Sequence, residues 1–357
     1  MKQSDPTAGA CVCSLPPNEP DIRTKVAFLS EATSYPQQPS SVDVIETHFA
    51  WVFLAGERAY KLKKPTQLRG ADWRTVAARE QACRAEVRLN SRLSAPTYLG
   101  VAPLTQSVHG LQIGGHGPAV DWLVVMRRLE RRRMLDSVLA AGTLRSADLD
   151  SVLETLIGFY KSQEPHVLAP SLYLQRCTAR VEESITVLTR ADVALSPECI
   201  IPLVAKLRAA LAAVQGELSV RASSGHVVQA HGDLRAEHVW LGPPVQIIDA
   251  LEVYDDLRLL DTAEEIAMLA VECESLGATS EAAYLRECYR RLAQDPVSDA
   301  LFDFYMAVRA ANRAKVAIWH LDDPSQFPDP ARWRTRALAD GAIAERHCSQ
   351  ILAVRPV

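Results

Sequence analysis

Several features that would place this chain in a common class of proteins are missing from its sequence. It contains no uninterrupted apolar run of roughly 18 residues, the minimum for a transmembrane helix. Its first twenty residues hold one lysine and no apolar core, so we expect no secretory signal there. Its net charge of −4 excludes a chain-wide basic surface for nucleic acid. We therefore expect a cytoplasmic protein that binds neither a membrane nor nucleic acid.

Motifs of several enzyme and metal-binding classes are also absent. The eight cysteines form no CxxC pair and have no zinc-ligand spacing, so free buried thiols are the expected state. The sequence has neither the GxxxxGK(S/T) loop of P-loop nucleotide-binding proteins nor the GxSxG motif of serine hydrolases. Zinc proteins, P-loop NTPases and hydrolases of that type are therefore disfavoured.

The sequence does contain enough apolar material for a large folded core. Of the 357 residues, 48% are hydrophobic and 23% are charged, which is typical of a globular protein. This length suits two domains or one large bilobal unit. Residues 1–20 are rich in Pro, Ser and Gly, and we expect them to form a disordered tail.

The order of predicted elements divides the rest of the chain into two lobes. Short alternating apolar runs and a helix-forming stretch predict strands at 42–46, 51–55, 59–62, 101–107 and 120–126, with a helix at 73–93. Beyond these the periodicity is mostly helical, apart from a β segment at 226–253. We therefore predict an α+β fold with a β-rich N-terminal lobe (21–125), a connector (126–133) and a helical C-terminal lobe (134–357).

The β segment carries the residues best suited to catalysis. Asp233 follows one short apolar strand, and Asp249 ends another strand sixteen positions later. A tight turn between the strands would bring the two carboxylates near each other. One carboxylate could orient and deprotonate a hydroxyl while the other holds Mg²⁺ on ATP, which is the division of labour that phosphoryl transfer requires.

A family resemblance rests on these same residues. The string His231-Gly232-Asp233-Leu234, followed by Ile247-Ile248-Asp249, resembles the signature of aminoglycoside phosphotransferases and of the related choline and homoserine kinases. Further matching strings lie at 46–54, 59–65 and 304–316, so the resemblance spans 42–317. More closely, the chain resembles bacterial aminoglycoside phosphotransferase-family enzymes of unknown substrate, in a stand-alone form without the C-terminal P-loop kinase domain of some members.

The resemblance implies a protein-kinase-like bilobal fold and ATP-dependent phosphorylation of a small-molecule hydroxyl, with Mg²⁺ or possibly Mn²⁺ as the metal. It makes Asp233 the catalytic base, counts His231 and Arg235 among the catalytic residues of the same loop, and makes Asp249 a metal ligand. His238 stands where the family carries an asparagine that holds metal. Since Mg²⁺ prefers oxygen ligands, His238 could serve Mn²⁺ or Glu237 could substitute.

The resemblance also implies a nucleotide site in the N-terminal lobe. Lys61 would reach the phosphates, with Lys63 as its rival two residues along the same strand face. Glu86 would be the partner of that lysine, and Glu80 is the alternative. Nucleotide contacts would further come from Thr47, His48, Met126, Arg127 and Leu129, the last three in a hinge that reads adenine. The segment containing Thr47 and His48 could instead be an ordinary hairpin turn.

Two other functions stay open at this point. If His238 impairs metal binding, the chain would be a nucleotide-binding pseudokinase that acts as a regulatory module. Nucleotidyl transfer on the same fold is a third and less favoured alternative.

Charge is distributed unevenly around the predicted site. Residues 249–265 hold seven carboxylates and one arginine, a net charge of −6. We expect Asp261 to hold the catalytic loop by accepting backbone hydrogen bonds, with Glu265 able to share that role. The other carboxylates, apart from Asp249, are expected to be solvated. Arg309 and Arg313, one helical turn apart, could form salt bridges with this acidic segment or, if they face the cleft, bind an anionic substrate.

Overall fold

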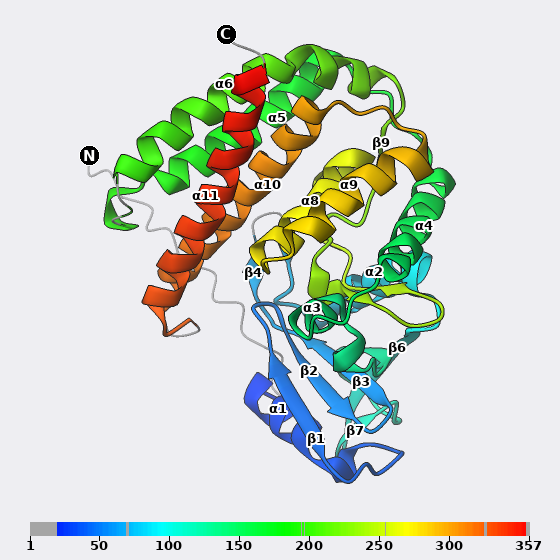
Figure 1. Cartoon of the computed structure of the whole chain (residues 1–357). Coiled ribbons are helices and arrows are strands. Elements are labelled where there is room, and N and C mark those ends of the chain that lie inside the picture. Colours follow the sequence, from blue (N-terminus) through cyan, green and yellow to red (C-terminus); the bar gives the residue numbers. More distant parts are fainter. Residues whose placement is uncertain are drawn as a thin grey trace, which may run out of the picture. The chain divides into compact units, whose positions relative to one another are not determined.

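The computed structural model describes residues 20–68, 71–193, 195, 197–253, 255–324 and 327–354 (Figure 1). The predicted disordered tail lies outside these ranges except for its last residue. The chain divides into two compact units. One unit holds the described residues up to Arg84 together with Gly100–Arg128, and the other holds Ala85–Leu99 and the described residues from Leu129 onward.

The first unit is built on a six-stranded sheet with the strand order β1-β2-β3-β8-β6-β7. Its strands are β1 (Val42–Glu46), β2 (Ala50–Ala55), β3 (Arg58–Lys63), β6 (Tyr98–Ser107), β7 (Gly110–Ile113) and β8 (Ala119–Arg127). Neighbouring β1, β2, β3 and β8 pair antiparallel. Gly56, with φ of +60°, makes the two-residue turn between β2 and β3. The predicted strands are confirmed, and the glycine-rich stretch 110–117 contributes β7.

Helix α1 (Ile22–Ser30) packs against this sheet and completes a small apolar core. Leu29 of the helix and Phe53, Leu62 and Leu123 of the strands are fully buried in that core. The alternation of apolar and polar residues along the strands places the apolar side chains on the covered face. A separate two-stranded ribbon, β4 (Gln67–Leu68) with β5 (Ala71–Asp72), leads into helix α2 (Val76–Ser94).

A buried charge cluster lies inside the first unit. Asp121 on β8 is fully buried and accepts hydrogen bonds from Arg79 Nε and Nη2, at 2.8 and 2.9 Å. The Nζ of Lys25, on α1, donates to the same carboxylate at 2.9 Å. Three elements are therefore joined through one buried carboxylate that two cations share.

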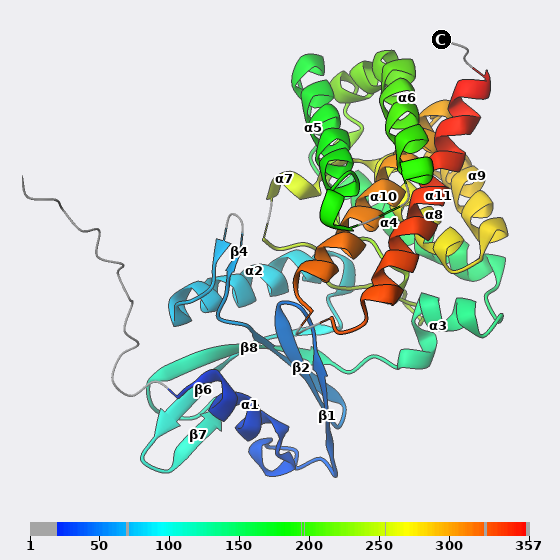
Figure 2. The same ribbon diagram turned by 90° about the vertical axis from the view of Figure 1, so that its left-hand side faces the viewer.

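The second unit is mainly helical (Figure 2). Its helices are α3 (Leu135–Ala140), α4 (Ser146–Ser162), α5 (Pro170–Leu188), α6 (Pro197–Ser223), α7 (Asp255–Arg258), α8 (Thr262–Ser275), α9 (Thr279–Ala293), α10 (Asp299–Trp319) and α11 (Pro330–Val354). Every residue of α8 from Thr262 to Cys273 is buried, and α10 is buried over most of its surface. Helices of this kind form the centre of a core, here covered by α5, α6, α9 and α11.

The long helix α6 passes one test for a membrane-spanning helix. Its stretch Glu198–Ser223 is long and apolar enough to cross a membrane by length and composition. Its residues Leu203, Leu207 and Val214 are nonetheless buried in the core of the second unit, where α6 packs against α5 and α11. A core helix of a soluble protein passes the same composition test, so this feature is weak evidence for a membrane span.

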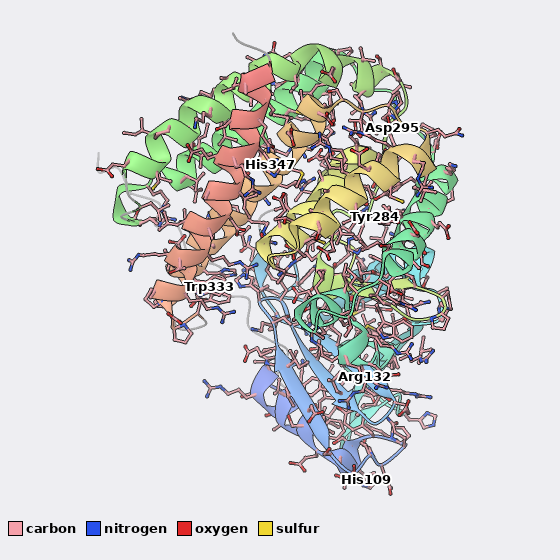
Figure 3. The ribbon with its side chains drawn as sticks, viewed as in Figure 1. His109, Arg132, Tyr284, Asp295, Trp333 and His347 are labelled. Carbon is pink, nitrogen blue, oxygen red and sulfur yellow. The ribbon has the colours of Figure 1, made fainter. Side chains whose placement is uncertain are left out.

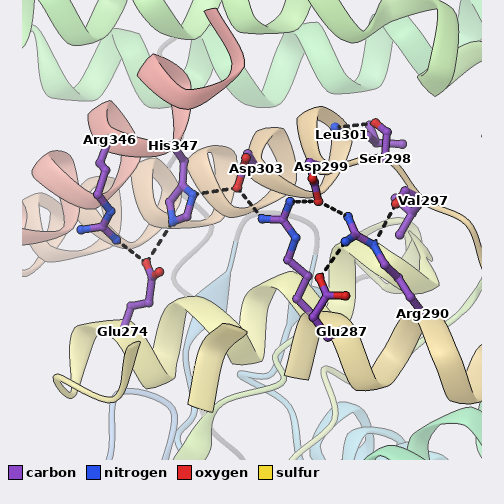
Figure 4. A network of polar contacts seen from close by, with 11 residues as sticks. Glu274, Glu287, Arg290, Val297, Ser298, Asp299, Leu301, Asp303, Arg346 and His347 are labelled. Carbon is purple, nitrogen blue, oxygen red and sulfur yellow. Dashed lines mark hydrogen bonds and ion pairs between the residues drawn. The ribbon is translucent and has the colours of Figure 1, made fainter. Parts of the chain in front are cut away.

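A buried ion-pair network joins α8, α9, α10 and α11 (Figure 4). The His347 ring bridges two carboxylates, with Nε2 2.9 Å from Glu274 and Nδ1 3.1 Å from Asp303. Arg346 also pairs with Glu274, and Arg286 also pairs with Asp303. Burial opposes the charged imidazole, but the hydrogen bonds to Asp303 and Glu274 outweigh it and raise the pKa of His347. The network therefore favours a protonated His347 in the folded protein.

The β segment of the second unit consists of short ribbons between the helices. β9 (Val227–Gln229) pairs antiparallel with β12 (Leu259–Asp261), and β10 (Val239–Trp240) pairs antiparallel with β11 (Gln246–Ile247). The predicted β segment at 226–253 is thereby present, and its loops carry both candidate acids.

Candidate active site

Asp233 and Asp249 lie on two loops that the β10–β11 ribbon brings together. Asp233 follows β9, and Asp249 follows β11. Between them lies His238, at the end of a 3-10 turn. Its Nδ1 is 2.8 Å from the backbone oxygen of Asp233, and its Nε2 is 3.8 Å from Oδ2 of Asp249. The sequence prediction that the two acids lie near each other is consistent with this arrangement, in which His238 contacts one loop and faces the other.

The hydrogen bond to Asp233 determines which nitrogen of His238 carries a proton. A backbone carbonyl can only accept, so Nδ1–H must be the donor. In the neutral ring Nε2 then holds a lone pair, which faces the Asp249 carboxylate. The two groups are too far apart for a hydrogen bond. In that tautomer Nε2 and Oδ2 of Asp249 lie 3.8 Å apart, and both atoms are possible ligands of one cation.

Glu265 of α8 holds the loop before Asp233 in place. Its fully buried carboxylate accepts hydrogen bonds from the backbone N–H of His231, at 3.1 Å, and of Gly232, at 2.7 Å. The hydroxyl of Tyr160 donates to it at 2.9 Å. The backbone before Asp233 is therefore anchored by a charged acceptor, which makes stronger hydrogen bonds than a neutral one.

The expectation that Asp261 holds the catalytic loop is wrong. Asp261 accepts from the backbone N–H of Ala263 as the N-cap of α8, and it pairs with Arg221 at 2.5 Å. Tyr305 donates to it as well. The reason is geometric, because Asp261 starts the helix whereas Glu265 lies one turn further on and faces the loop. Glu265 thus fills the role that the sequence allowed it to share, and Glu264 is also buried, which corrects the expectation that it is solvated.

His231 and Gly232 also hold the backbone of the loop that contains Asp233. His231 is fully buried, its Nε2 donates to the Ile248 carbonyl at 2.8 Å, and its Nδ1 accepts from the Asp233 N–H at 3.3 Å. Burial lowers the pKa of His231, in keeping with a neutral ring. Gly232 has φ of +88°, and a Cβ there would lie 3.0 Å from a side-chain carbon of Arg258. The site therefore requires glycine at this position.

Two residues that belong to no sequence motif, Tyr98 and Asn90, hold the backbone at Asp249. Asp249 has φ of +63°, an unusual conformation for a residue with a side chain. Its N–H donates to the hydroxyl of Tyr98 at 3.1 Å, and the N–H of Ala250 donates to Oδ1 of Asn90 at 2.7 Å. Asn90 and Tyr98 are about 150 positions earlier in the chain, so sequence spacing gave no indication of these contacts. Their hydrogen bonds stabilise the strained residue.

The lysine and glutamate candidates differ in their surroundings. Lys61 and Lys63 both lie on β3; Lys63 is buried, with Nζ 4.8 Å from the ring centroid of Trp73. Glu80 forms an ion pair on the helix surface with Arg84, whereas Glu86 is fully buried. A buried carboxylate such as Glu86 requires a polar or charged partner. Glu80 has its partner, Arg84, on the helix surface. The choice of Lys61 and Glu86 stays a prediction.

The other proposed nucleotide contacts lie in the first unit or at its end. Thr47 closes the turn between β1 and β2 through hydrogen bonds with Ala50, and His48 stacks edge-on against Phe49. Met126 and Arg127 are the last residues of β8, and Leu129 begins the next compact unit. Their roles toward a nucleotide stay predictions.

A cavity of about 210 Å³ opens beside Asp233 within the second unit. Its charged lining includes Asp233, Arg235, Glu272, Arg309, Arg313 and Arg336. The two arginines of α10 that were singled out in the sequence therefore both face this cavity. They also form ion pairs, Arg309 with Glu264 at 2.6 Å and Arg313 with Glu272 and Asp340. Arg309 and Arg313 therefore form salt bridges and also face the cavity, which were the two alternatives from the sequence.

Asp249 and His238 have a donor set that a divalent cation could share with a nucleotide. Within the described ranges no group of three or more His, Cys, Asp or Glu side chains is arranged to hold a metal. Mg²⁺ sites that serve nucleotides commonly use one or two carboxylates and complete their coordination with phosphate oxygens and water. The imidazole of His238 is better accepted by a transition metal such as Mn²⁺ than by Mg²⁺. Asp249 and His238 therefore fit a divalent ion whose other ligands are phosphate oxygens and water, and the imidazole favours Mn²⁺ as that ion.

Comparisons with known proteins place this geometry in context. No protein-family model matches the chain. Uncharacterized proteins of Mycobacterium tuberculosis and Mycobacterium bovis are each 36% identical to it over 279 residues, which is 77% of this chain and 54% of theirs. The chain thus spans about half the length of these curated relatives.

Among solved structures, a choline/ethanolamine kinase family protein from Mesorhizobium loti is similar to the chain with a TM-score of 0.51. The sequences are 14% identical, and the similarity covers 92% of this chain and 99% of that one. At this identity the likeness concerns the fold, and it extends over the β-rich and the helical unit alike. The chain therefore has an α+β fold similar to that of this choline/ethanolamine kinase family protein.

Proposed function

We propose that this protein is an ATP-dependent phosphotransferase that acts on a hydroxyl group of a small molecule. The observation that carries the proposal is the position of Asp233. Its carboxylate lines the cavity beside α10, and its backbone is linked through His238 to the loop of Asp249. The fold likeness to a protein named as a choline/ethanolamine kinase family member supports the same reaction class.

In this proposal Asp233 orients the acceptor and takes its proton. The hydroxyl oxygen forms a bond to the γ-phosphorus of ATP, the bond from that phosphorus to the bridging oxygen breaks, and ADP leaves. The exposed carboxylate of Asp233 can accept the hydroxyl proton, while Glu265 and His231 fix the backbone that aims it. Asp249 and His238 would hold the divalent ion, which would neutralise charge on the phosphates.

The nucleotide contacts are proposed for the same residues as the sequence predicts. Lys61, with Glu86 as its partner, would bind the phosphates, as would the Thr47–His48 turn. Adenine would be read at Met126, Arg127 and Leu129. The antiparallel pairing of β3 with β8 supports this, because it places Lys61 in register with Val124 on the strand that leads to the hinge.

His238 also supports a second candidate function. Because imidazole is a poor ligand for Mg²⁺, a chain that accepts neither Mg²⁺ nor Mn²⁺ would bind nucleotide without transferring phosphate. Such a protein would be a pseudokinase that acts as a regulatory module. The two functions differ in whether ATP is turned over.

A metabolite screen by mass spectrometry tests the proposal. The full chain is incubated with ATP, either metal ion and a small-molecule extract, and new phosphorylated species are sought. Asp233→Asn, which keeps the shape of the side chain, should abolish them. Asp256→Asn removes an exposed carboxylate of the nearby acidic segment and is the matched control. Nucleotide binding with no turnover in the wild type would favour the pseudokinase instead.

A further inference from the structure

The charged side chains that line the cavity beside Asp233 are four arginines and two carboxylates, Asp233 and Glu272. Arg309 and Arg313 lie one turn apart on α10, Arg336 comes from α11, and Arg235 comes from the loop after Asp233. Helices α10 and α11 lie side by side and run antiparallel, with Trp333 near the start of α11 (Figure 3). Four guanidinium groups from three segments thus surround one small space.

The carboxylates beside these arginines are shared among several guanidinium groups. Glu264 pairs with both Arg180 and Arg309, at 2.8 and 2.6 Å. Asp340 likewise lies near both Arg313 and Arg336, at 3.2 and 3.8 Å, and Glu272 adds one more carboxylate at Arg313. Glu264 and Asp340 are thus each shared between two guanidinium groups. The remaining arginine, Arg235, pairs with Glu237.

The arginines also retain unused hydrogen-bond donors. The Nε of Arg309 is buried and has no hydrogen-bond acceptor among the residues that the structure describes. A guanidinium carries five N–H donors, so a single ion pair leaves most of them available. Planar guanidinium groups are suited to bind carboxylate or phosphate oxygens, often with two hydrogen bonds at once.

Repulsion among the arginines also favours an anionic ligand in this cavity. Burial lowers the pKa of Arg313, Asp340 opposes this change, and the charges of Arg336 and Arg235 add to it. An anion between these groups would relieve the repulsion, whereas an ammonium group would add to it. The cavity is therefore better suited to an anionic ligand than to an amine.

We infer that the acceptor substrate carries an oxyanion, a carboxylate or a phosphate, in addition to its reacting hydroxyl. The inference rests on the proposed phosphotransferase function and adds the substrate class. Arg309, Arg313 and Arg336 bind the oxyanion, and the hydroxyl lies at Asp233, where it loses its proton and receives the γ-phosphoryl group of ATP. The side chains of Met268, Val316 and Trp333 contact the carbon body between the two groups.

Binding to the nucleotide-free full chain tests this inference separately from catalysis. Isothermal titration with inorganic phosphate, glycerate, glycerol and choline compares anionic, neutral and cationic probes. Glycerate and glycerol differ by one carboxylate, and we expect glycerate to bind at least about tenfold more tightly. Choline should not bind detectably. Failure of both anions to bind, or equal affinity for glycerol or choline, would overturn the inference.

Two variants with a matched control locate the anion. Arg336 is 37% exposed, so Arg336→Gln should fold, and it should weaken binding of phosphate and glycerate about tenfold. Arg235→Gln is a second exposed variant with the same expected direction. Arg346→Gln removes an arginine from the same helix, outside the cavity, and should leave both affinities unchanged. Equal affinities in all three variants would contradict the proposed site.

The outcome also separates the inference from the function on which it rests. Anion binding at the arginines without any ATP turnover would contradict the phosphotransferase and leave the anion site intact. Turnover on a neutral or cationic acceptor, with no anion binding, would overturn the inference and leave the phosphotransferase intact.

Discussion

The Nε2 of His238 faces the carboxylate of Asp249 at 3.8 Å while its Nδ1 donates to the backbone of Asp233. This single ring therefore links the proposed base to the proposed metal ligand. In the proposed site it would also set the metal preference, since a nitrogen replaces the amide oxygen that an asparagine would offer.

The first prediction concerns His238→Asn. Because an amide oxygen suits Mg²⁺ better than imidazole does, the variant should gain Mg²⁺-dependent ATP turnover relative to Mn²⁺-dependent turnover. The wild type should show the opposite preference. Steady-state ATPase assays at matched metal concentrations measure the ratio, and an unchanged ratio in the variant would show that His238 does not contact the metal.

The second prediction concerns the anchor of the catalytic loop. Glu265→Gln keeps one oxygen acceptor but removes the charge that binds the N–H groups of His231 and Gly232. Hydrogen bonds to charged groups contribute about 1.5–3 kcal/mol, so we expect turnover to fall about tenfold or more. Nucleotide affinity, measured by thermal shift, should change little. Glu281→Gln, a partly exposed carboxylate on α9, serves as control.

The third prediction concerns the buried charges of the first unit. Asp121→Asn removes the carboxylate that the two buried cations Arg79 and Lys25 share. We expect the free energy of unfolding to fall by about 3–5 kcal/mol. Urea denaturation measures it, and Asp72→Asn, at an exposed pair with Arg74, should cost far less. Similar losses in both variants would contradict the assignment of Asp121 as a structural centre.

The fourth prediction concerns pH. Burial lowers the pKa of His347, but Asp303 and Glu274 accept hydrogen bonds from its ring and raise the pKa above the ordinary value. Its contribution to stability is therefore fully present below the ordinary value of 6.5 and is lost as pH rises through the folded pKa. The stability difference between wild type and His347→Gln should shrink over that rise. A constant difference across pH would contradict the protonated state, and His109→Gln, an exposed histidine, is the control.

Much of this fold could be predicted because its information is local. Alternating runs predicted β1, β2, β3 and β8 nearly residue by residue, since each strand has one covered face. The motif around Asp233 and Asp249 predicted that they lie on neighbouring loops. These features depend on residues within a few positions of one another.

The errors and omissions involve contacts between distant segments. Asp261 and Glu265 are both acidic and differ by one helical turn, so only the orientation of α8 shows which one faces the loop. Asn90 and Tyr98 support Asp249 from a helix and strand early in the chain. The cavity role of Arg309 and Arg313 depends on how α10 packs, which periodicity alone does not determine.

The central claim is that Asp233 accepts the proton of a small-molecule hydroxyl while that hydroxyl is phosphorylated. The most direct test is the ATP-dependent gain of one phosphoryl group by an acceptor, followed by mass spectrometry with Mn²⁺ present. We predict that the wild type and Asp256→Asn form the phosphorylated product and that Asp233→Asn does not. Equal product formation by Asp233→Asn, or ATP binding with no product from any acceptor, would contradict the claim.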